Sequence, residues 1–399
     1  DEALHAHETA RTLYQQTKDT RGEASAWNNL GGALQELRRF DEALHAHETA
    51  GTLFQQTGDA NGQATGWNNL GGALQELRRF DEALHAHETA RTLYQQTKDT
   101  RGEASAWNNL GGTLQKLRRF NEALHAHETA RTLYQQTGDA HSEANAWNNL
   151  GGALQELRRF NEALHAHETA RTLYQQTGDA HSEASAWDSL GGALQELRRY
   201  DEAVHAHETA RTLYQQTEDT RGEASAWDSL GLTLQELRRY DEAVHAHETA
   251  RTLYQQTEDT RGEANAWNNL GLTLQELRRF DDAHDAHETA RDLYQQIGDT
   301  HSEAMAWNNL GTACRGLSRF EEAMAVGRQA VEMLVTAEDW FRTGEAWGEL
   351  ATTLTAAGGD SGQVRDAWNE SAAAYARAGA DEEAAASRAH TDSPEVLEE

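Results

Sequence analysis

The chain has 399 residues and is strongly acidic, with 35 lysines and arginines against 66 aspartates and glutamates and a formal net charge of −31. Nucleic acids and anionic membrane surfaces bind basic faces, so this charge argues against both as partners and favours basic or neutral ligands. Cys314 is the single cysteine and no apolar run could span a membrane, which excludes a disulfide framework and fits a cytoplasmic location.

Residues 1–20 begin in the middle of a repeated pattern. An apolar stripe at helical spacing matches the second helix of the later repeats. Its members are Ala3, Ala6, Ala10, Leu13 and Tyr14. We therefore expect an unpaired second helix here, with an open apolar face that would permit self-association.

Residues 21–340 contain eight copies of a forty-residue unit, each with a tryptophan followed three residues later by Leu-Gly. The tryptophans are Trp27, Trp67, Trp107, Trp147, Trp187, Trp227, Trp267 and Trp307. A fixed period of this length is typical of solenoids, in which each unit buries its apolar face against its neighbours. The period therefore predicts one continuous array.

Each unit has the pattern of a helical hairpin, as residues 141–180 show. The first apolar stripe consists of Ala144, Trp147, Leu150, Gly151, Leu154 and Leu157, and the second of Ala163, Ala166, His167, Ala170, Leu173 and Tyr174. Asn161, or Asp in other units, is expected to cap the second helix; Gly178 should end it, and Asp179 should cap the next first helix. The predicted fold is all-α, an array of antiparallel helical hairpins.

The copies diverge near the end of the chain. Residues 341–390 are expected to form a ninth, divergent hairpin and a capping helix, since terminal repeats need a polar outer face. Residues 391–399 contain the single proline, Pro394, and are expected to form a disordered acidic tail.

The unit resembles the tetratricopeptide repeat. The family's pattern of tryptophan, Leu-Gly and two alanines falls on Trp147, Leu150, Gly151, Ala163 and Ala170. His167 stands where the family carries a large aromatic, the usual proline is absent, and the period is forty rather than thirty-four. This longer form is similar to Leu-Gly-Asn adaptors, kinesin light chains and, most of all, the repeat arms of actinobacterial signal-transduction ATPases and regulators.

The resemblance implies a right-handed superhelix whose first helices line a concave, peptide-binding face. A helical projection places the asparagine after each tryptophan and the later glutamine opposite the buried stripe. Amides suit a peptide backbone, and the family's first-helix asparagines commonly hold ligand groups. The expected contacts are Asn28, Asn68, Asn108, Asn148, Asp188, Asp228, Asn268, Asn308, Gln115, Gln155, Gln195, Leu232 and Leu272.

This face varies along the array. Asp188 and Asp228 replace the asparagine, and Leu232 and Leu272 replace a glycine, in the fifth to seventh units. The changes predict a more acidic and more apolar patch for a basic or amphipathic segment. The alternative is that these residues lie on a solvent-exposed face whose sequence has drifted and which binds no ligand.

A His-x-His pair occurs in most second helices, as at His45 and His47. Residues two apart on a helix point about 200° away from each other, so one pair cannot chelate one ion. We expect His47 and its equivalents to be buried and His45 and its equivalents to point outward, with no metal bound.

The sequence shows no nucleophile–base pair and no phosphate-binding loop; Gly151 and Gly152 lie inside a predicted helix. We therefore expect neither an enzyme nor a cofactor. The leading hypothesis is a scaffold that binds a protein or peptide along its concave face. The alternatives are a sensor or autoinhibitory arm of a larger ATPase or transcriptional regulator, and a self-associating repeat.

Overall fold

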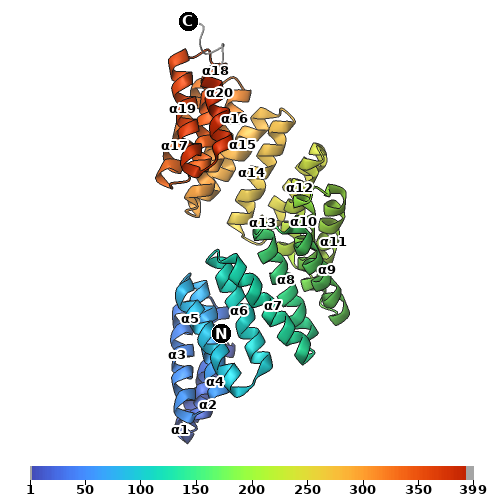
Figure 1. Cartoon of the computed structure of the whole chain (residues 1–399), viewed down its shortest axis with the longest axis vertical. Coiled ribbons are helices and arrows are strands. Elements are labelled where there is room, and N and C mark those ends of the chain that lie inside the picture. The colour runs from blue at the N-terminus through green and yellow to red at the C-terminus, as the bar shows by residue number, and fades with distance from the viewer. Residues whose placement is uncertain (1, 392–399) are drawn as a thin grey trace. The chain divides into compact units, whose positions relative to one another are not determined.

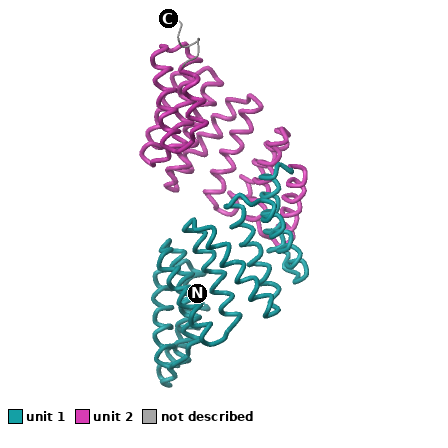
Figure 2. The backbone as a smooth tube through the Cα atoms, viewed as in Figure 1, with its two compact units in different colours: residues 1–199 teal, residues 200–399 magenta. Residues whose placement is uncertain are grey.

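The computed structural model describes residues 2–391, and all its regular elements there are α-helices joined by short turns (Figure 1). The chain divides into two units, residues 1–199 and 200–399 (Figure 2). The first unit contains α1 (Glu2–Thr17), α2 (Thr20–Glu36), α3 (Phe40–Thr57), α4 (Ala60–Glu76), α5 (Phe80–Thr97), α6 (Thr100–Lys116), α7 (Phe120–Thr137), α8 (Ala140–Glu156), α9 (Phe160–Thr177) and α10 (Ala180–Glu196). The second contains α11 (Tyr200–Gln216), α12 (Thr220–Glu236), α13 (Tyr240–Gln256), α14 (Thr260–Glu276), α15 (Phe280–Gln296), α16 (Thr300–Gly316), α17 (Phe320–Thr336), α18 (Trp340–Ala356), α19 (Ser361–Ala378) and α20 (Asp381–Thr391).

First helices begin where the sequence predicts. Gly138 ends α7 in the left-handed conformation, with φ of 70°, which glycine adopts without a steric penalty. The next residue, Asp139, accepts a hydrogen bond from the Ser142 N–H at 3.1 Å and caps α8. The Gly-Asp pair between units is therefore both a stop and a start signal.

Second helices begin two residues earlier than predicted. Arg159 is the N-cap of α9 and makes no side-chain capping bond, so the expectation that Asn161 caps the helix was wrong. Arg158 has a left-handed backbone conformation, and the Arg159 backbone N–H donates a hydrogen bond to the Leu154 carbonyl at 2.9 Å. The chain turns at this point, and the next helix begins at Phe160. The Arg159 guanidinium instead pairs with Glu162 at 2.7 Å on the surface.

The core lies between consecutive helices within each unit. Leu150 and Leu154 of α8 pack against Ala163 and Ala166 of α9 and Ala193 of α10. The alanines are almost fully buried and short enough to let the helix backbones approach closely. This packing confirms the predicted all-α array of helical hairpins.

The last hairpin, α18 and α19, is followed by α20. The predicted tail lies outside the described residues, except for Thr391, which ends α20. No described helix has the length and apolarity needed to cross a bilayer.

Candidate functional site

Each predicted groove asparagine of the first unit is bound to a histidine of its own hairpin. Asn148 of α8 accepts a hydrogen bond from His167 Nδ1 of α9, with 2.8 Å between the two atoms. The same pair joins Asn28 to His47 at 3.0 Å and Asn108 to His127 at 3.1 Å. Asn68 pairs with His87 in the same way. We call this contact the histidine–asparagine pair.

The histidine ring occupies space that a glycine leaves open. A Cβ atom built on Gly151 would lie 2.5 Å from Cε1 of His167, far inside van der Waals contact. His167 is buried, as predicted for this position, whereas His165 is exposed and meets the Trp147 ring edge-on. The Leu-Gly motif therefore admits a buried imidazole between the two helices.

The asparagines are also joined from one repeat to the next. The Asn149 amide donates to the Asn108 side-chain oxygen at 3.1 Å, so that oxygen accepts from two groups. Gln115 donates to the Asn149 backbone carbonyl at 3.3 Å, and Gln155 donates to the Ser189 carbonyl at 3.5 Å. These polar side chains link neighbouring first helices, and they are half-buried.

Burial keeps the paired histidines neutral. Removal from water lowers the pKa of His47, His87, His127 and His167 to about 4, because burial disfavours the imidazolium ion. A neutral ring can donate from Nδ1 to the asparagine oxygen and still accept at Nε2. In His167 the atom 3.3 Å from Nε2 is the Gln155 side-chain oxygen, which is itself an acceptor, so this glutamine supplies no donor to Nε2 of a ring that donates from Nδ1.

Asp228 of α12 takes the asparagine's place beside a buried imidazole. Its carboxylate lies 2.7 Å from Nδ1 of His247 and is 15% exposed, while the His247 side chain is fully buried. The Asn269 amide also donates to it, at 3.1 Å. Asp228 is therefore engaged inside its hairpin, which differs from the freely displayed acidic patch expected from the sequence.

Other predicted groove residues, including members of that patch, lie in both units. Asp188 and Gln195 lie half-buried on α10 of the first unit. Leu232 lies on α12 and is 37% exposed, which makes it one of the large apolar side chains on the surface. The binding role of these residues stays a prediction.

The histidine–asparagine pair is broken in the hairpin of α16 and α17. Asn308 is retained, but Gly327 stands where the earlier units carry the histidine. The Asn308 side-chain oxygen is buried and has no hydrogen-bond partner among residues 2–391. Its neighbour Asn309 still donates to the Asn268 oxygen, at 3.0 Å.

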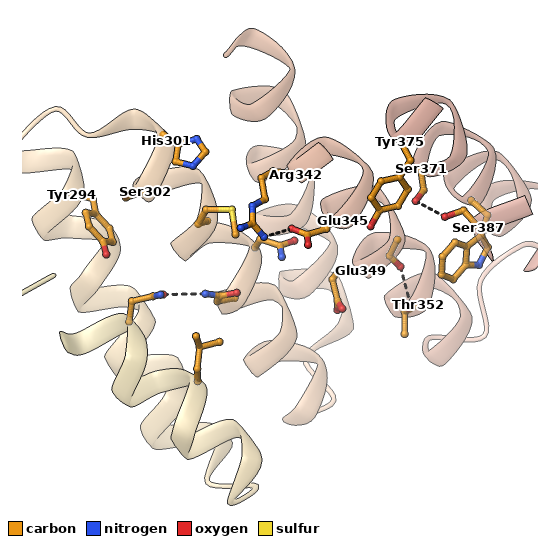
Figure 3. A pocket seen from close by; sticks show the side chains of 17 residues that line it. Tyr294, His301, Ser302, Arg342, Glu345, Glu349, Thr352, Ser371, Tyr375 and Ser387 are labelled. Atoms are coloured by element: carbon orange, nitrogen blue, oxygen red, sulfur yellow. Dashed lines mark hydrogen bonds and ion pairs between the residues drawn. The ribbon is translucent and has the colours of Figure 1, made fainter. Parts of the chain in front are cut away.

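Asn308 lines a cavity of about 700 Å³ in the second unit (Figure 3). The cavity runs across the first helices α14, α16 and α18 and continues onto α19 and α20. Three of the predicted groove residues meet here: Asn268, Leu272 and Asn308. The structure thus brings part of the predicted set together, at the divergent end of the chain.

Charged side chains of α18 line the middle of the cavity. Arg342 pairs with Glu345 at 2.7 Å, one turn apart on the helix (Figure 3). Glu349 lies further along α18 and pairs with Arg315 at 2.6 Å, while Thr312 donates to the same carboxylate. These residues have no counterpart in the repeated units, so the repeat pattern gave no means of finding them.

The far end of the cavity is aromatic and hydroxyl-rich. Tyr375 of α19 projects into it (Figure 3). Trp368 of the same helix also lines the cavity and stacks on His390, with ring centroids 4.2 Å apart. The Ser371 hydroxyl donates to the Gly344 carbonyl at 2.7 Å. The cavity therefore combines amides, a guanidinium, carboxylates and aromatic faces, which are groups that recognise peptides.

One cluster outside this cavity has metal-ligand chemistry. Potential ligand atoms of His284, Cys314 and Glu322 lie within 4.8 Å of one another. Burial raises the pKa of the Cys314 thiol to about 11. The prediction that no metal is bound stays a prediction.

The first helix, α1, presents the open face predicted for self-association. None of its described side chains is buried, and Leu13 and Tyr14 are 55% and 38% exposed. Self-association through this face stays a prediction.

Comparison with known proteins defines the family. The sequence model of the Tetratricopeptide repeat matches residues 22–96, 62–136, 102–176, 142–216, 182–256 and 262–334. These matches cover most of the chain, which therefore belongs to the tetratricopeptide repeat family. No curated protein sequence matches it.

Solved structures share the fold at low sequence identity. A Signal Transduction ATPase with Numerous Domains with a tetratricopeptide repeat sensor, from Pyrococcus horikoshii, is 12% identical with a TM-score of 0.67, over 91% of this chain and 55% of that protein. The quorum sensor NprR from B. thuringiensis is 14% identical with a TM-score of 0.60, over 84% and 98%. RapI is 12% identical with a TM-score of 0.57, over 69% and 99%. At these identities the likeness establishes the fold, and the chain spans about half of the first protein.

Proposed function

We propose that this chain is a non-catalytic binding module that captures a peptide or a partner helix in the cavity across α14, α16 and α18. The observation that carries the proposal is the convergence of Asn268, Leu272 and Asn308 in one cavity of about 700 Å³. A family of protein-interaction repeats and a peptide-like set of recognition groups both support it.

The free Asn308 oxygen suits a backbone N–H of an extended or helical ligand. A buried acceptor without a partner is unfavourable by about 1–3 kcal/mol, and a ligand that donates to it removes that penalty. For the oxygen to be reached, the side chain must rotate towards the cavity it lines. The neighbouring Arg342 and Glu345 can then fix the direction of the peptide through its polar side chains.

Charge favours a basic or amphipathic ligand. Glu345 and Glu349 line the cavity paired with Arg342 and Arg315, so the negative field is that of the whole chain, which carries a formal charge of −31. Leu272 and Met305 supply an apolar wall. A segment with basic and apolar faces would satisfy both features.

A sensor arm of a larger signalling protein remains the alternative. Two of the structural neighbours are described as sensors, and in one of them the repeats belong to a multidomain ATPase. The same cavity would then receive the signal, and a cytoplasmic location would suit either role. Both readings require that ligand binding use the cavity.

The experiment is selection of twelve-residue peptides from a displayed random library against the full chain, followed by calorimetry. We expect enrichment of peptides with basic and apolar residues, and weaker binding after Leu272→Ala or Glu345→Gln. Loss of an apolar wall contact or one charged contact corresponds to roughly a tenfold change in Kd.

Leu232→Ala is the matched control. Leu232 occupies the equivalent position one unit earlier, is 37% exposed whereas Leu272 is half-buried, and does not line the cavity. Equal weakening by Leu232→Ala and Leu272→Ala would contradict the assignment of the cavity. Unchanged binding after both Leu272→Ala and Glu345→Gln would contradict it as well.

A further inference from the structure

An arginine covers the tryptophan in nearly every repeat. The Arg131 guanidinium of α7 lies over the Trp147 ring of α8, 4.6 Å from its centroid. The same contact recurs at 4.5–4.7 Å along the chain, between Arg11 and Trp27, Arg91 and Trp107, Arg171 and Trp187, Arg211 and Trp227, Arg251 and Trp267, and Arg291 and Trp307. A guanidinium over an indole face is a favourable cation–π contact, and these second helices supply it internally.

Among the eight forty-residue units, one lacks this arginine. Gly51 of α3 occupies the equivalent position, so no side chain of α3 can cover Trp67 of α4 as the arginines do elsewhere. A Cβ atom built on Gly51 would meet nothing within 4 Å, which shows open space there. Trp67 keeps its edge-on contact with His85, with 6.3 Å between centroids.

A cavity of about 730 Å³ opens beside Trp67, lined by Gly51, Glu48 and Asp81 among others. The matching cavity beside Trp27, where Arg11 is present, measures about 430 Å³. Both cavities have second helices as walls and an indole between them, and the larger one also reaches Gln55, Gln63 and Gly66. Gly51 and Gly66 stand where the unit of Trp27 has Arg11 and Ala26, so the larger volume follows the loss of these two side chains, of which the arginine is the larger.

The charges left around Trp67 are mainly negative. Glu48, Asp81 and Glu82 line the cavity together with Arg79, which pairs with Glu82 at 2.6 Å. Glu48 and Asp81 therefore remain as carboxylates without that partner. In the repeat of Trp27, Glu8 and Asp41 stand in the same places, with the Arg11 guanidinium between the helices.

We propose that the cavity beside Trp67 binds an arginine side chain of a partner protein. The guanidinium would stack on the Trp67 indole, as Arg131 does on Trp147, and Glu48 and Asp81 would balance its charge. Arginine fits better than lysine because its planar group stacks on an indole while donating hydrogen bonds in its own plane. This site belongs to the first unit and is separate from the cavity proposed above.

The test uses the full chain labelled with 5-fluorotryptophan and followed by fluorine NMR. Trp67→Phe identifies the Trp67 signal, and the probes are N-acetylarginine amide and a pentapeptide with one arginine between glycines. We expect a saturable shift of the Trp67 signal, with Kd on the order of 1 mM. N-acetyllysine amide should bind more weakly, and N-acetylcitrulline amide, which is uncharged, about tenfold more weakly or not at all.

Gly51→Arg is the decisive variant, since it restores the residue found in the other repeats. We expect the Trp67 signal to stop responding to the arginine probes, and the melting temperature to rise because arginine favours helix more than glycine does. The Trp27 signal, whose ring is covered by Arg11, should stay unchanged in both proteins. A Trp67 signal that ignores arginine, follows citrulline equally, or still responds in Gly51→Arg would overturn the proposal.

The converse variant is Arg11→Gly, which copies the Trp67 environment into the repeat of Trp27. The Trp27 signal should then acquire a response to the arginine probes; a folded variant without this response would contradict the proposal. If circular dichroism shows loss of helix, Arg11→Ala replaces it, since alanine removes the guanidinium and favours helix.

Discussion

Two hairpins of the same fold differ in many residues, and one of these differences, at the position of the buried histidine, changes what their polar groups can do. In the hairpin of α8 and α9, the Asn148 oxygen is occupied by His167 at 2.8 Å. In the hairpin of α16 and α17, Gly327 replaces that histidine, and the Asn308 oxygen has no partner among the described residues. The copied repeats use their amides to hold the array together, whereas the divergent end has a buried amide oxygen with no partner among residues 2–391.

The same contrast appears at the glycine of the Leu-Gly motif. Gly151 faces the His167 ring, whereas the nearest atoms to a Cβ built on Gly311 lie 3.5 Å away, at ordinary contact distance. Glycine is therefore required in the first hairpin and is dispensable in the second. Paired substitutions at equivalent positions can test this difference directly.

The largest effect is expected for Gly151→Ala. Its Cβ would overlap a buried ring that cannot move without breaking the bond to Asn148, so we expect a loss of about 3 kcal/mol of stability. Gly311→Ala should stabilise the chain by up to about 1 kcal/mol, because alanine favours helix over glycine. Urea unfolding, with hydrogen exchange in α8 and α16, measures both; similar losses in the two variants would contradict the comparison.

Asn148→Ala should have the next largest effect. It leaves the buried His167 Nδ1–H without its acceptor, at a cost of about 2 kcal/mol. Asn308→Ala removes an oxygen that has no partner within residues 2–391, so stability should be unchanged or slightly higher. The same unfolding measurement applies, and a loss in Asn308→Ala equal to that in Asn148→Ala would show that Asn308 is bonded after all.

The sequence was sufficient to predict the helices and the burial of the second histidine. The forty-residue period and the spacing of Trp147, Leu150 and Leu154 place the apolar stripe, and the structure buries His167 as expected. These features are predictable because each depends on one helix and a pattern that recurs. Repetition makes a local signal unambiguous.

The partners of the asparagines could not be predicted in the same way. A helical projection assumes that a helix has one buried face. Helix α8 instead contacts α9 of its own hairpin through Asn148, and the neighbouring first helix α10 through Gln155. Asn148 therefore points away from the Trp147 stripe and still meets a buried ring. The cavity beside α18 was missed for another reason: Arg342, Glu345 and Glu349 occur once, so no periodic signal marks them.

The buried histidines should also make the copied repeats sensitive to acid. The pKa of His127 is lowered to about 4 in the fold, against about 6.5 when unfolded, so its stabilising effect is complete above pH 6.5 and is lost as pH falls towards 4. Each such ring should remove about 1.4 kcal/mol of stability per pH unit in that range. His127→Phe keeps a ring in the same space. It should reduce the slope of unfolding free energy against pH by about 1.4 kcal/mol per pH unit, as measured by unfolding from pH 7 to 4.5.

Hydrogen exchange can then compare the two kinds of hairpin in one sample. Protection of α6 and α7, which contain the Asn108–His127 pair, should fall steeply below pH 6.5 after correction for the intrinsic exchange rate. Protection of α16 and α17 should fall less, because Gly327 has no group to titrate at this position. Equal decreases in both hairpins, or an unchanged slope in His127→Phe, would mean that other groups control the acid response and that the histidine–asparagine pair does not distinguish the copied repeats.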